Sequence, residues 1–89
     1  MDILDKRIVV TGAAGGIGKA LAKAFKNEGA KFVLIADIDG ERATETAAEL
    51  GFKSFQLNVG NEEEIKSLID FMNKEEGGID IFCSNAGIG

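Results

Sequence analysis

A glycine-rich segment, Thr11-Gly12-Ala13-Ala14-Gly15-Gly16-Ile17-Gly18, is the part of this sequence best suited to bind a ligand. Gly12 can adopt the positive φ of a tight turn, and Gly16 leaves no Cβ where a ligand approaches the backbone. If a helix begins near Gly16, the free N–H groups of its first turn and the helix dipole form an anion site without a basic side chain. Gly18, one turn into that helix, lets the helix pack closely on a sheet. This glycine motif (residues 11–18) therefore predicts a phosphate or diphosphate site.

Asp37 is the acidic residue that could bind a sugar beside that anion. It lies nineteen residues beyond Gly18, close to the spacing of about 20 expected for a ribose-binding acid. A carboxylate there can accept hydrogen bonds from the 2′- and 3′-hydroxyls of an adenosine, and it would repel a 2′-phosphate. Neither residues 13–15 nor Ile38 supplies a cation to offset that repulsion. The pattern predicts NAD(H) rather than NADP(H).

Each of these features also has a purely structural interpretation. The glycine motif could serve only a turn and the packing of a helix on a sheet. A P-loop is not indicated, because Gly18-Lys19 is followed by Ala20 rather than by Ser or Thr. Asp37 or Asp39 could instead cap the helix that follows, and we favour that role for Asp39.

Residues suited to acid–base or metal chemistry are few. The chain has no Tyr and no His, the commonest general acids and bases apart from carboxylates and Lys. Its one cysteine, Cys83, lies in an apolar run and is interpreted as a small core residue. A disulfide within the chain and a metal site built from Cys and His are therefore excluded.

Short β-rich runs alternate with helical patterns along the whole chain. Strands are predicted over residues 7–11, 31–36, 52–59 and 79–84. Helices are predicted between them, over residues 17–29, 41–50 and 61–77. The third helix would open on a capping box formed by Asn61 and Glu64. The βαβαβαβ alternation predicts an α/β fold with a doubly wound parallel sheet in the order 3-2-1-4.

Composition excludes several classes of protein. The 89 residues carry 10 Lys and Arg against 15 Asp and Glu, a net charge of −5 that disfavours nucleic acid or an anionic membrane as partner. The longest apolar run, residues 32–36, is far short of the ~20 residues that span a bilayer. The first residues contain no apolar core of signal-peptide length. We expect a soluble, cytoplasmic protein.

Two motifs in order along the chain carry a family resemblance. Residues 11–18 contain the pattern Thr-Gly-x-x-x-Gly-x-Gly, and Asn85-Ala86-Gly87 follows the fourth predicted strand, five residues after Asp80. This arrangement resembles the short-chain dehydrogenase/reductase family, over the whole of this chain but only about the first third of such an enzyme. The resemblance implies a Rossmann-type fold, NAD as cofactor, and hydride transfer between nicotinamide and a carbonyl or alcohol carbon.

The resemblance also implies cofactor-binding roles for residues after the strands. Asn58-Val59 stands where the family places Asp-Val against adenine, and the Asn58 side-chain oxygen could accept a hydrogen bond from the adenine amino group. A turn role for Asn58 fits equally well. Asn85 is expected to stabilise the central sheet, with Ala86 and Gly87 leaving room for the cofactor. The cofactor-binding residues predicted are Gly12, Ala14, Gly16, Ile17, Gly18, Asp37, Ile38, Asn58, Val59, Asn85, Ala86 and Gly87.

The family's catalytic groups have no counterpart here. They are a Tyr, a Lys four residues later and a Ser on the preceding strand, whereas this chain has no Tyr and its serines fall on other elements. We expect residues 1–89 to be one cofactor-binding segment of a domain that is incomplete after the fourth strand. We expect this segment to be inactive alone, and a substrate to bind only when the C-terminal half is present. The alternatives are a non-catalytic NAD-binding or regulatory module and an interaction fragment with a vestigial site.

The fourth predicted strand would leave an apolar edge. Ile79, Ile81 and Cys83 are expected on one of its faces and Phe82 on the other. Long apolar edges tend to pair with another strand. We therefore expect the chain to self-associate through this edge.

Overall fold

The computed structural model describes residues 2–85 as alternating strands and helices. The elements are β1 (Arg7–Thr11), α1 (Gly16–Asn27), β2 (Phe32–Asp37), α2 (Gly40–Leu50), β3 (Lys53–Gln56), α3 (Glu62–Glu76) and β4 (Ile81–Ser84). The predicted βαβαβαβ alternation is confirmed. Within this described part of the chain, no helix is long and apolar enough to cross a membrane.

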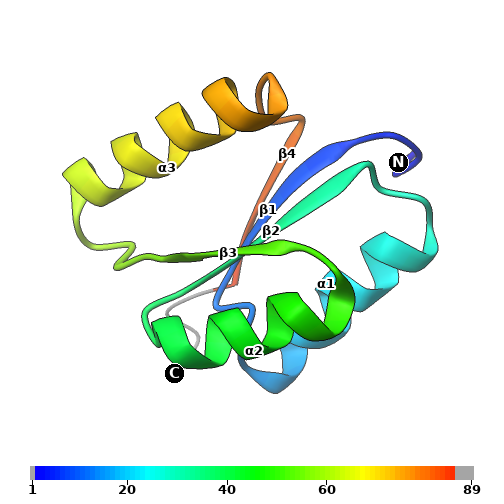
Figure 1. Cartoon of the computed structure of the whole chain (residues 1–89), viewed down its shortest axis with the longest axis horizontal. Helices are drawn as coiled ribbons and strands as arrows, with labels where there is room; N and C mark the ends of the chain where they lie inside the picture. The colour runs from blue at the N-terminus through cyan, green and yellow to red at the C-terminus, as the bar shows by residue number, and fades with distance from the viewer. Residues whose placement is uncertain (1, 86–89) are drawn as a thin grey trace.

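The four strands form one parallel sheet in the predicted order, β3-β2-β1-β4. β1 is a central strand, and its last residue, Thr11, lies opposite Ala36 of β2 and Ser84 of β4. Each helix returns the chain to the edge of the sheet where the strands begin, so all four strands end at one common edge. Figure 1 shows α1 and α2 on one face of the sheet and α3 on the other.

The two central strands are buried on both faces, as parallel strands covered by helices must be. Alternate side chains point to opposite faces. The strand residues packed with α1 and α2 are Ile8, Val10, Val33 and Ile35. Those packed with Leu68 and Met72 of α3 are Val9, Leu34 and Ala36. This double layer fixes the direction of β1 and β2 and hence the position of the residues that follow them.

The N-caps of α2 and α3 are the side chains expected from the sequence. Asp39 caps α2 by accepting a hydrogen bond from the Arg42 N–H at 3.1 Å, which confirms the role favoured for it. Asn61 caps α3 by accepting from the N–H groups of Glu63 and Glu64 at 3.0 and 3.2 Å. The starts of both helices are therefore fixed by local side chains.

The capping box predicted at the start of α3 forms only in part. The Glu64 carboxylate accepts a hydrogen bond from the Asn58 N–H at 3.0 Å. The Asn61 N–H, which a complete box would pair with Glu64, donates instead to the Asn58 carbonyl at 2.9 Å. The prediction was wrong for this half, because the turn before α3 provides a nearer acceptor for Asn61.

Two strands are shorter than predicted. β3 ends at Gln56 rather than at residue 59, because the chain turns where the Asn58 side chain accepts from the Gly60 N–H at 2.9 Å. β4 begins at Ile81 rather than at residue 79. Ile79 therefore packs with the α3 side of the sheet, and the face it was expected to share with Ile81 and Cys83 is a wrong prediction.

Candidate functional site

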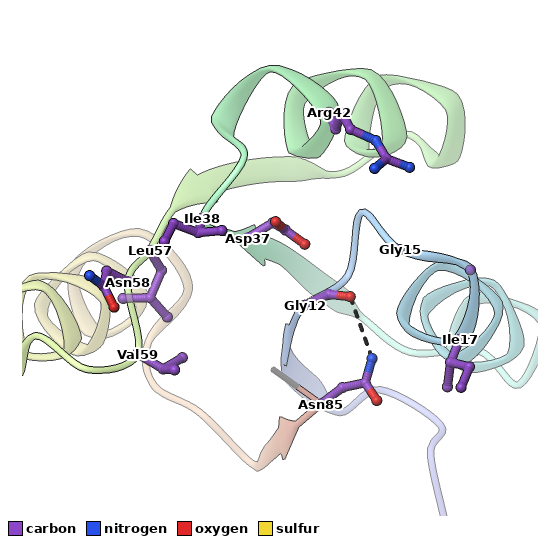
Figure 2. Close-up of a pocket in the computed structure, with 11 residues that line it drawn as sticks. Gly12, Gly15, Ile17, Asp37, Ile38, Arg42, Leu57, Asn58, Val59 and Asn85 are labelled. Atoms are coloured by element: carbon purple, nitrogen blue, oxygen red, sulfur yellow. Dashed lines mark hydrogen bonds between the residues drawn. The ribbon is translucent and has the colours of Figure 1, made fainter. Parts of the chain in front are cut away.

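A pocket of about 490 Å³ lies at the edge where the strands end. Ligands of open α/β sheets bind at this edge, and the volume falls within the range of roughly 300–1,000 Å³ typical of small-molecule sites. Figure 2 shows that its lining comes from the segments after several strands and from the starts of α1 and α2. The lining residues are Gly12, Gly15, Gly16, Ile17, Asp37, Ile38, Arg42, Leu57, Asn58, Val59 and Asn85.

The structure gives different reasons for Gly12, Gly16 and Gly18 of the motif. Gly12 has φ +64°, the left-handed conformation that turns the chain sharply after β1. A Cβ on Gly18 would lie 2.2 Å from the Gly12 carbonyl oxygen, so α1 packs tightly against this turn rather than against the strand itself. A Cβ on Gly16 would meet no protein atom within 4 Å. Because Gly16 also lines the pocket, packing alone does not account for the motif.

The start of α1 faces the pocket with its backbone amides. Its N-cap residue is Gly15, which has no side chain to cap the helix, and its first turn contains no acidic residue. The first three helical N–H groups, from Gly16 to Gly18, accordingly have no intrahelical acceptor. Together with the helix dipole they are suited to bind a phosphate group.

Asp37 is held beside these amides by two backbone hydrogen bonds. Its Oδ2 accepts from the Ala14 N–H at 3.1 Å, and its Oδ1 accepts from the Asp39 N–H at 2.9 Å. Asp37 is therefore not the cap of α2, which is Asp39. Each carboxylate oxygen has two lone pairs, so both can still accept from a ligand hydroxyl.

Asn58 lines the pocket and also forms the turn after β3. Its side-chain oxygen accepts from the Gly60 N–H, which supports the turn role. Within residues 2–85 its Nδ2 has no hydrogen-bond partner. The oxygen has a second lone pair, so it can still accept from an adenine amino group as expected, and Nδ2 can donate to a ring nitrogen.

Asn85 ties the end of β4 to the turn after β1. Its backbone N–H donates to Thr11 Oγ1 at 3.1 Å, and its Nδ2 donates to the Gly12 carbonyl at 3.4 Å (Figure 2). Thr11 is buried. These contacts fix the glycine turn relative to β4 and agree with the sheet-stabilising role expected of Asn85.

The structure brings most of the predicted residues together. Those that line the pocket are Gly12, Gly16, Ile17, Asp37, Ile38, Asn58, Val59 and Asn85. Gly18 and Ala14 do not line it: Gly18 is packed against the turn, and Ala14 is nearly buried and binds Asp37 through its N–H. Ala86 and Gly87 lie outside the described residues.

Sequence reasoning missed Gly15, Leu57 and, most importantly, Arg42. The Arg42 guanidinium donates to the Ala14 carbonyl at 3.3 Å and lines the pocket. The sequence analysis considered only residues 13–15 and Ile38 as sources of a cation beside Asp37, and Arg42 supplies one from the following helix. Helical side chains lean toward the N-terminus of their helix, so a basic residue in the first turn of the helix after Asp37 is the sequence signal for this cation.

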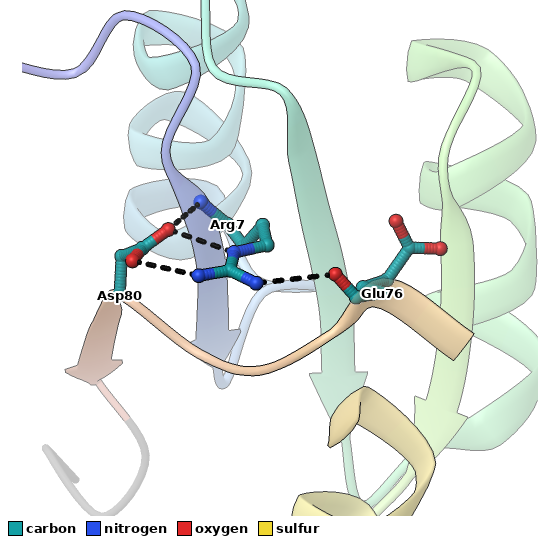
Figure 3. Close-up of polar contacts among 3 residues, drawn as sticks. All are labelled: Arg7, Glu76 and Asp80. Carbon is teal, nitrogen blue, oxygen red and sulfur yellow. Dashed lines mark hydrogen bonds and ion pairs between the residues drawn. The ribbon is translucent and has the colours of Figure 1, made fainter. Parts of the chain in front are cut away.

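The clearest charge pairing lies away from the pocket. Arg7, at the start of β1, forms an ion pair with Asp80 at 2.9 Å (Figure 3). The Arg7 side-chain hydrogen bonds lower the pKa of Asp80 far below the ordinary aspartate range. Since the pocket lies where β1 ends, this pair belongs to the scaffold.

In the described residues, no cluster of His, Cys, Asp and Glu could hold a metal ion.

The short chain dehydrogenase family model matches residues 6–89. The chain belongs to this family. Galactitol 2-dehydrogenase of Agrobacterium fabrum is 46% identical over 90 residues, which cover 99% of this chain and 35% of that protein. (+)-cis,trans-Nepetalactol synthase NEPS2 of Nepeta racemosa is 41% identical over 86 residues, covering 93% and 32%. The chain thus spans about a third of the length of these short chain dehydrogenase relatives.

Solved structures agree with the fold. A hydroxysteroid dehydrogenase from Escherichia coli matches with a TM-score of 0.85 and 34% identity, covering 96% of this chain and 38% of that one. A structure described as a ribose-5-phosphate isomerase from Brucella melitensis matches with a TM-score of 0.89 and 33% identity, covering 98% and 34%. The names of these proteins include a dehydrogenase, a synthase and an isomerase. The third of each of these proteins that matches this chain therefore indicates a Rossmann-type fold and not a particular substrate.

Proposed function

We propose that the pocket binds NAD(H), with the diphosphate at the start of α1 and the adenosine ribose at Asp37. The observation that carries this proposal is that one pocket presents both the uncapped first turn of α1 and the Asp37 carboxylate. The fit is supported by Gly16, whose lack of a side chain serves no packing purpose. Asp37 would accept from the ribose hydroxyls and oppose a 2′-phosphate, which favours NAD(H) over NADP(H).

We also propose that the protein is an NAD-dependent oxidoreductase acting on CH–OH groups, with this segment supplying the cofactor-binding half. The bound nicotinamide would supply or accept the hydride. The residues of this chain would hold and orient the dinucleotide, and they offer no Tyr or His to move the proton. We therefore expect the 89 residues alone to bind cofactor without turning over a substrate.

A second candidate function is a non-catalytic module that binds the dinucleotide as a regulatory signal. The observation that favours it is that the pocket features described, the uncapped first turn of α1 and the Asp37 carboxylate, are suited to binding, which is all that this function requires. The two functions differ in the intact protein, because a dehydrogenase reduces NAD⁺ in the presence of an alcohol and a sensor does not. NADH formation followed at its absorbance maximum against a panel of alcohols and polyols separates them.

Calorimetry with NAD⁺ and NADP⁺ tests the cofactor proposal. We expect NAD⁺ to bind more tightly, and Asp37→Asn to weaken NAD⁺ binding by about tenfold, because ionised acceptors form the stronger hydrogen bonds. Asp70→Asn is the matched control, since Asp70 is an exposed carboxylate on α3 that does not line the pocket. Absence of NAD⁺ binding, or equal affinity in wild type and Asp37→Asn, would contradict the proposal.

A further inference from the structure

Arg42 is the one cationic side chain that lines the pocket within residues 2–85. It lies in the first turn of α2 and is exposed. Figure 2 shows its side chain extending from α2 toward the glycine turn, with Asp37 reaching toward the same turn from β2. The pocket therefore contains one carboxylate and one guanidinium.

The positive charge of Arg42 is not neutralised by a neighbouring acid. The ion pairs among the described residues are Arg7–Asp80, Lys19–Glu49 and Lys53–Glu75. The only partner of the Arg42 guanidinium there is the neutral carbonyl oxygen of Ala14, at a long 3.3 Å. A single long hydrogen bond to a neutral acceptor is easily exchanged for a bond to an anion, which is the stronger kind.

Arg42 and Asp37 bind the same residue of the glycine turn. The Ala14 N–H donates to Asp37, and the Ala14 carbonyl accepts from Arg42. The two charged groups therefore stand on either side of one residue. A phosphate on the 2′-oxygen of a ribose held by Asp37 would come within reach of the guanidinium, whose planar donors suit a phosphate.

We propose that Arg42 is a specificity-determining residue, which offers a cation to a 2′-phosphate and limits the discrimination that Asp37 imposes against NADP(H). This proposal rests on the proposed binding of a dinucleotide in this pocket. The preference is set by a balance of the two charges, with Asp37 favouring the free ribose and Arg42 favouring its 2′-phosphate. Removing the Asp37 charge therefore shifts the preference toward NADP(H), and removing the Arg42 charge shifts it toward NAD(H).

The test is calorimetry with NAD⁺ and NADP⁺ on the intact protein and on Arg42→Gln. Gln keeps an N–H donor for the Ala14 carbonyl while removing the charge. We expect Arg42→Gln to weaken NADP⁺ binding by about tenfold and to change NAD⁺ binding by less than about twofold. Lys66→Gln, an exposed position on α3, is the control for the loss of one positive charge far from the pocket.

A second pair of variants shows whether Arg42 acts directly on the 2′-phosphate. Asp37→Ser should tighten NADP⁺ binding by about tenfold while Arg42 is present, and the double variant Asp37→Ser/Arg42→Gln should bind NADP⁺ about tenfold more weakly than Asp37→Ser. Equal effects of Arg42→Gln on both cofactors would mean that Arg42 only holds the glycine turn, and would overturn the inference. If wild type binds neither cofactor, the proposed function itself fails. If wild type binds NAD⁺ but the ratio of NAD⁺ to NADP⁺ affinity is the same in Arg42→Gln, this inference alone is overturned.

Discussion

Gly16 and Gly18 lie two residues apart at the start of α1, and the surroundings give a different reason for each. A side chain at Gly18 would collide with the backbone of the turn after β1, with its Cβ 2.2 Å from an oxygen. A Cβ at Gly16 would meet no protein atom within 4 Å, and Gly16 lines the pocket where a ligand is expected. We therefore propose that Gly16 serves binding, whereas Gly18 serves packing and stability.

This difference predicts opposite phenotypes for two similar substitutions. We expect Gly18→Ala to lower the free energy of unfolding by about 2 kcal/mol, because the turn must shift to admit the methyl group. Gly16→Ala should leave that free energy unchanged or raise it by about 0.5 kcal/mol, while weakening NAD⁺ binding by about tenfold. Urea denaturation and calorimetry measure the two effects. Wild-type affinity in Gly16→Ala would mean that the motif serves packing alone.

Two residues of the pocket show what a sequence can and cannot predict about a site. The position of Asp37 in the pocket was predictable because it depends on a spacing, and the strand that carries it is a clear apolar run. Arg42 was not recognised, because its direction depends on where α2 begins, and that start is set by the Asp39 cap. A shift of one residue in the cap would turn the Arg42 side chain by about 100° around the helix.

Among the elements, the junction of β1, α3 and β4 depends on Arg7. Its backbone N–H and Nε donate to Asp80 Oδ2 at 2.8 and 2.9 Å, and its Nη2 donates to Oδ1 at 3.1 Å. Its Nη1 also donates to the Glu76 carbonyl at the end of α3, at 3.3 Å (Figure 3). One side chain therefore links the first strand to the segment that leads into the fourth.

The lowered pKa of Asp80 predicts a loss of stability in acid. A carboxyl whose pKa is lower in the folded than in the unfolded protein stabilises the fold above its unfolded value, and this stabilisation disappears as the pH falls toward its folded value. We expect the unfolding free energy to fall as the pH decreases below the ordinary aspartate range. Asp80→Asn should be less stable at neutral pH and lose less stability on acidification.

Thermal melts at several pH values measure this effect. Glu75→Gln is the control, because it removes a carboxylate from the looser Lys53–Glu75 pair, at 3.6 Å. It should retain most of the wild-type loss of stability in acid. If Asp80→Asn and wild type lose stability in parallel, the contact between Arg7 and Asp80 does not stabilise the fold in the way the structure indicates.

Strand order was predictable from the alternation of elements, but strand ends were not. Leu57 and Val59 continue the apolar pattern of β3, so the sequence favoured a strand to residue 59. The turn depends on hydrogen bonds of Asn58 with Gly60 and Glu64, and Glu64 reaches it only after α3 has formed. Hydrogen bonds between side chains and the backbone of a turn override the apolar pattern, which is why the end of β3 was misplaced.

At the scale of the whole molecule, β4 has one paired edge and one open edge. It pairs with β1, and no other strand of the described residues lies beside it. Phe82, in the middle of β4, is 43% exposed. We propose that the 89-residue chain by itself associates with a second copy through this edge.

Light scattering over a range of concentrations tests this proposal. We expect the average mass to rise with concentration in wild type and to stay closer to the monomer in Phe82→Lys, since a lysine on an edge strand discourages pairing. Ile69→Lys is the matched control, because Ile69 is similarly exposed, at 39%, but lies on α3. A wild-type chain that stays monomeric at every concentration would refute the proposal.

The central position of β1 has a consequence for how the molecule is made. On the ribosome, β2 emerges soon after β1, but β4 emerges only after β3 and α3. Until then one edge of β1 stays unpaired, and nascent chains with unpaired edges are targets for chaperones and for misassembly. The contacts of Asn85 with Thr11 and Gly12 form only when β4 docks. The turn after β1 therefore acquires its working geometry only once the chain has been extended by a further 74 residues, to Asn85.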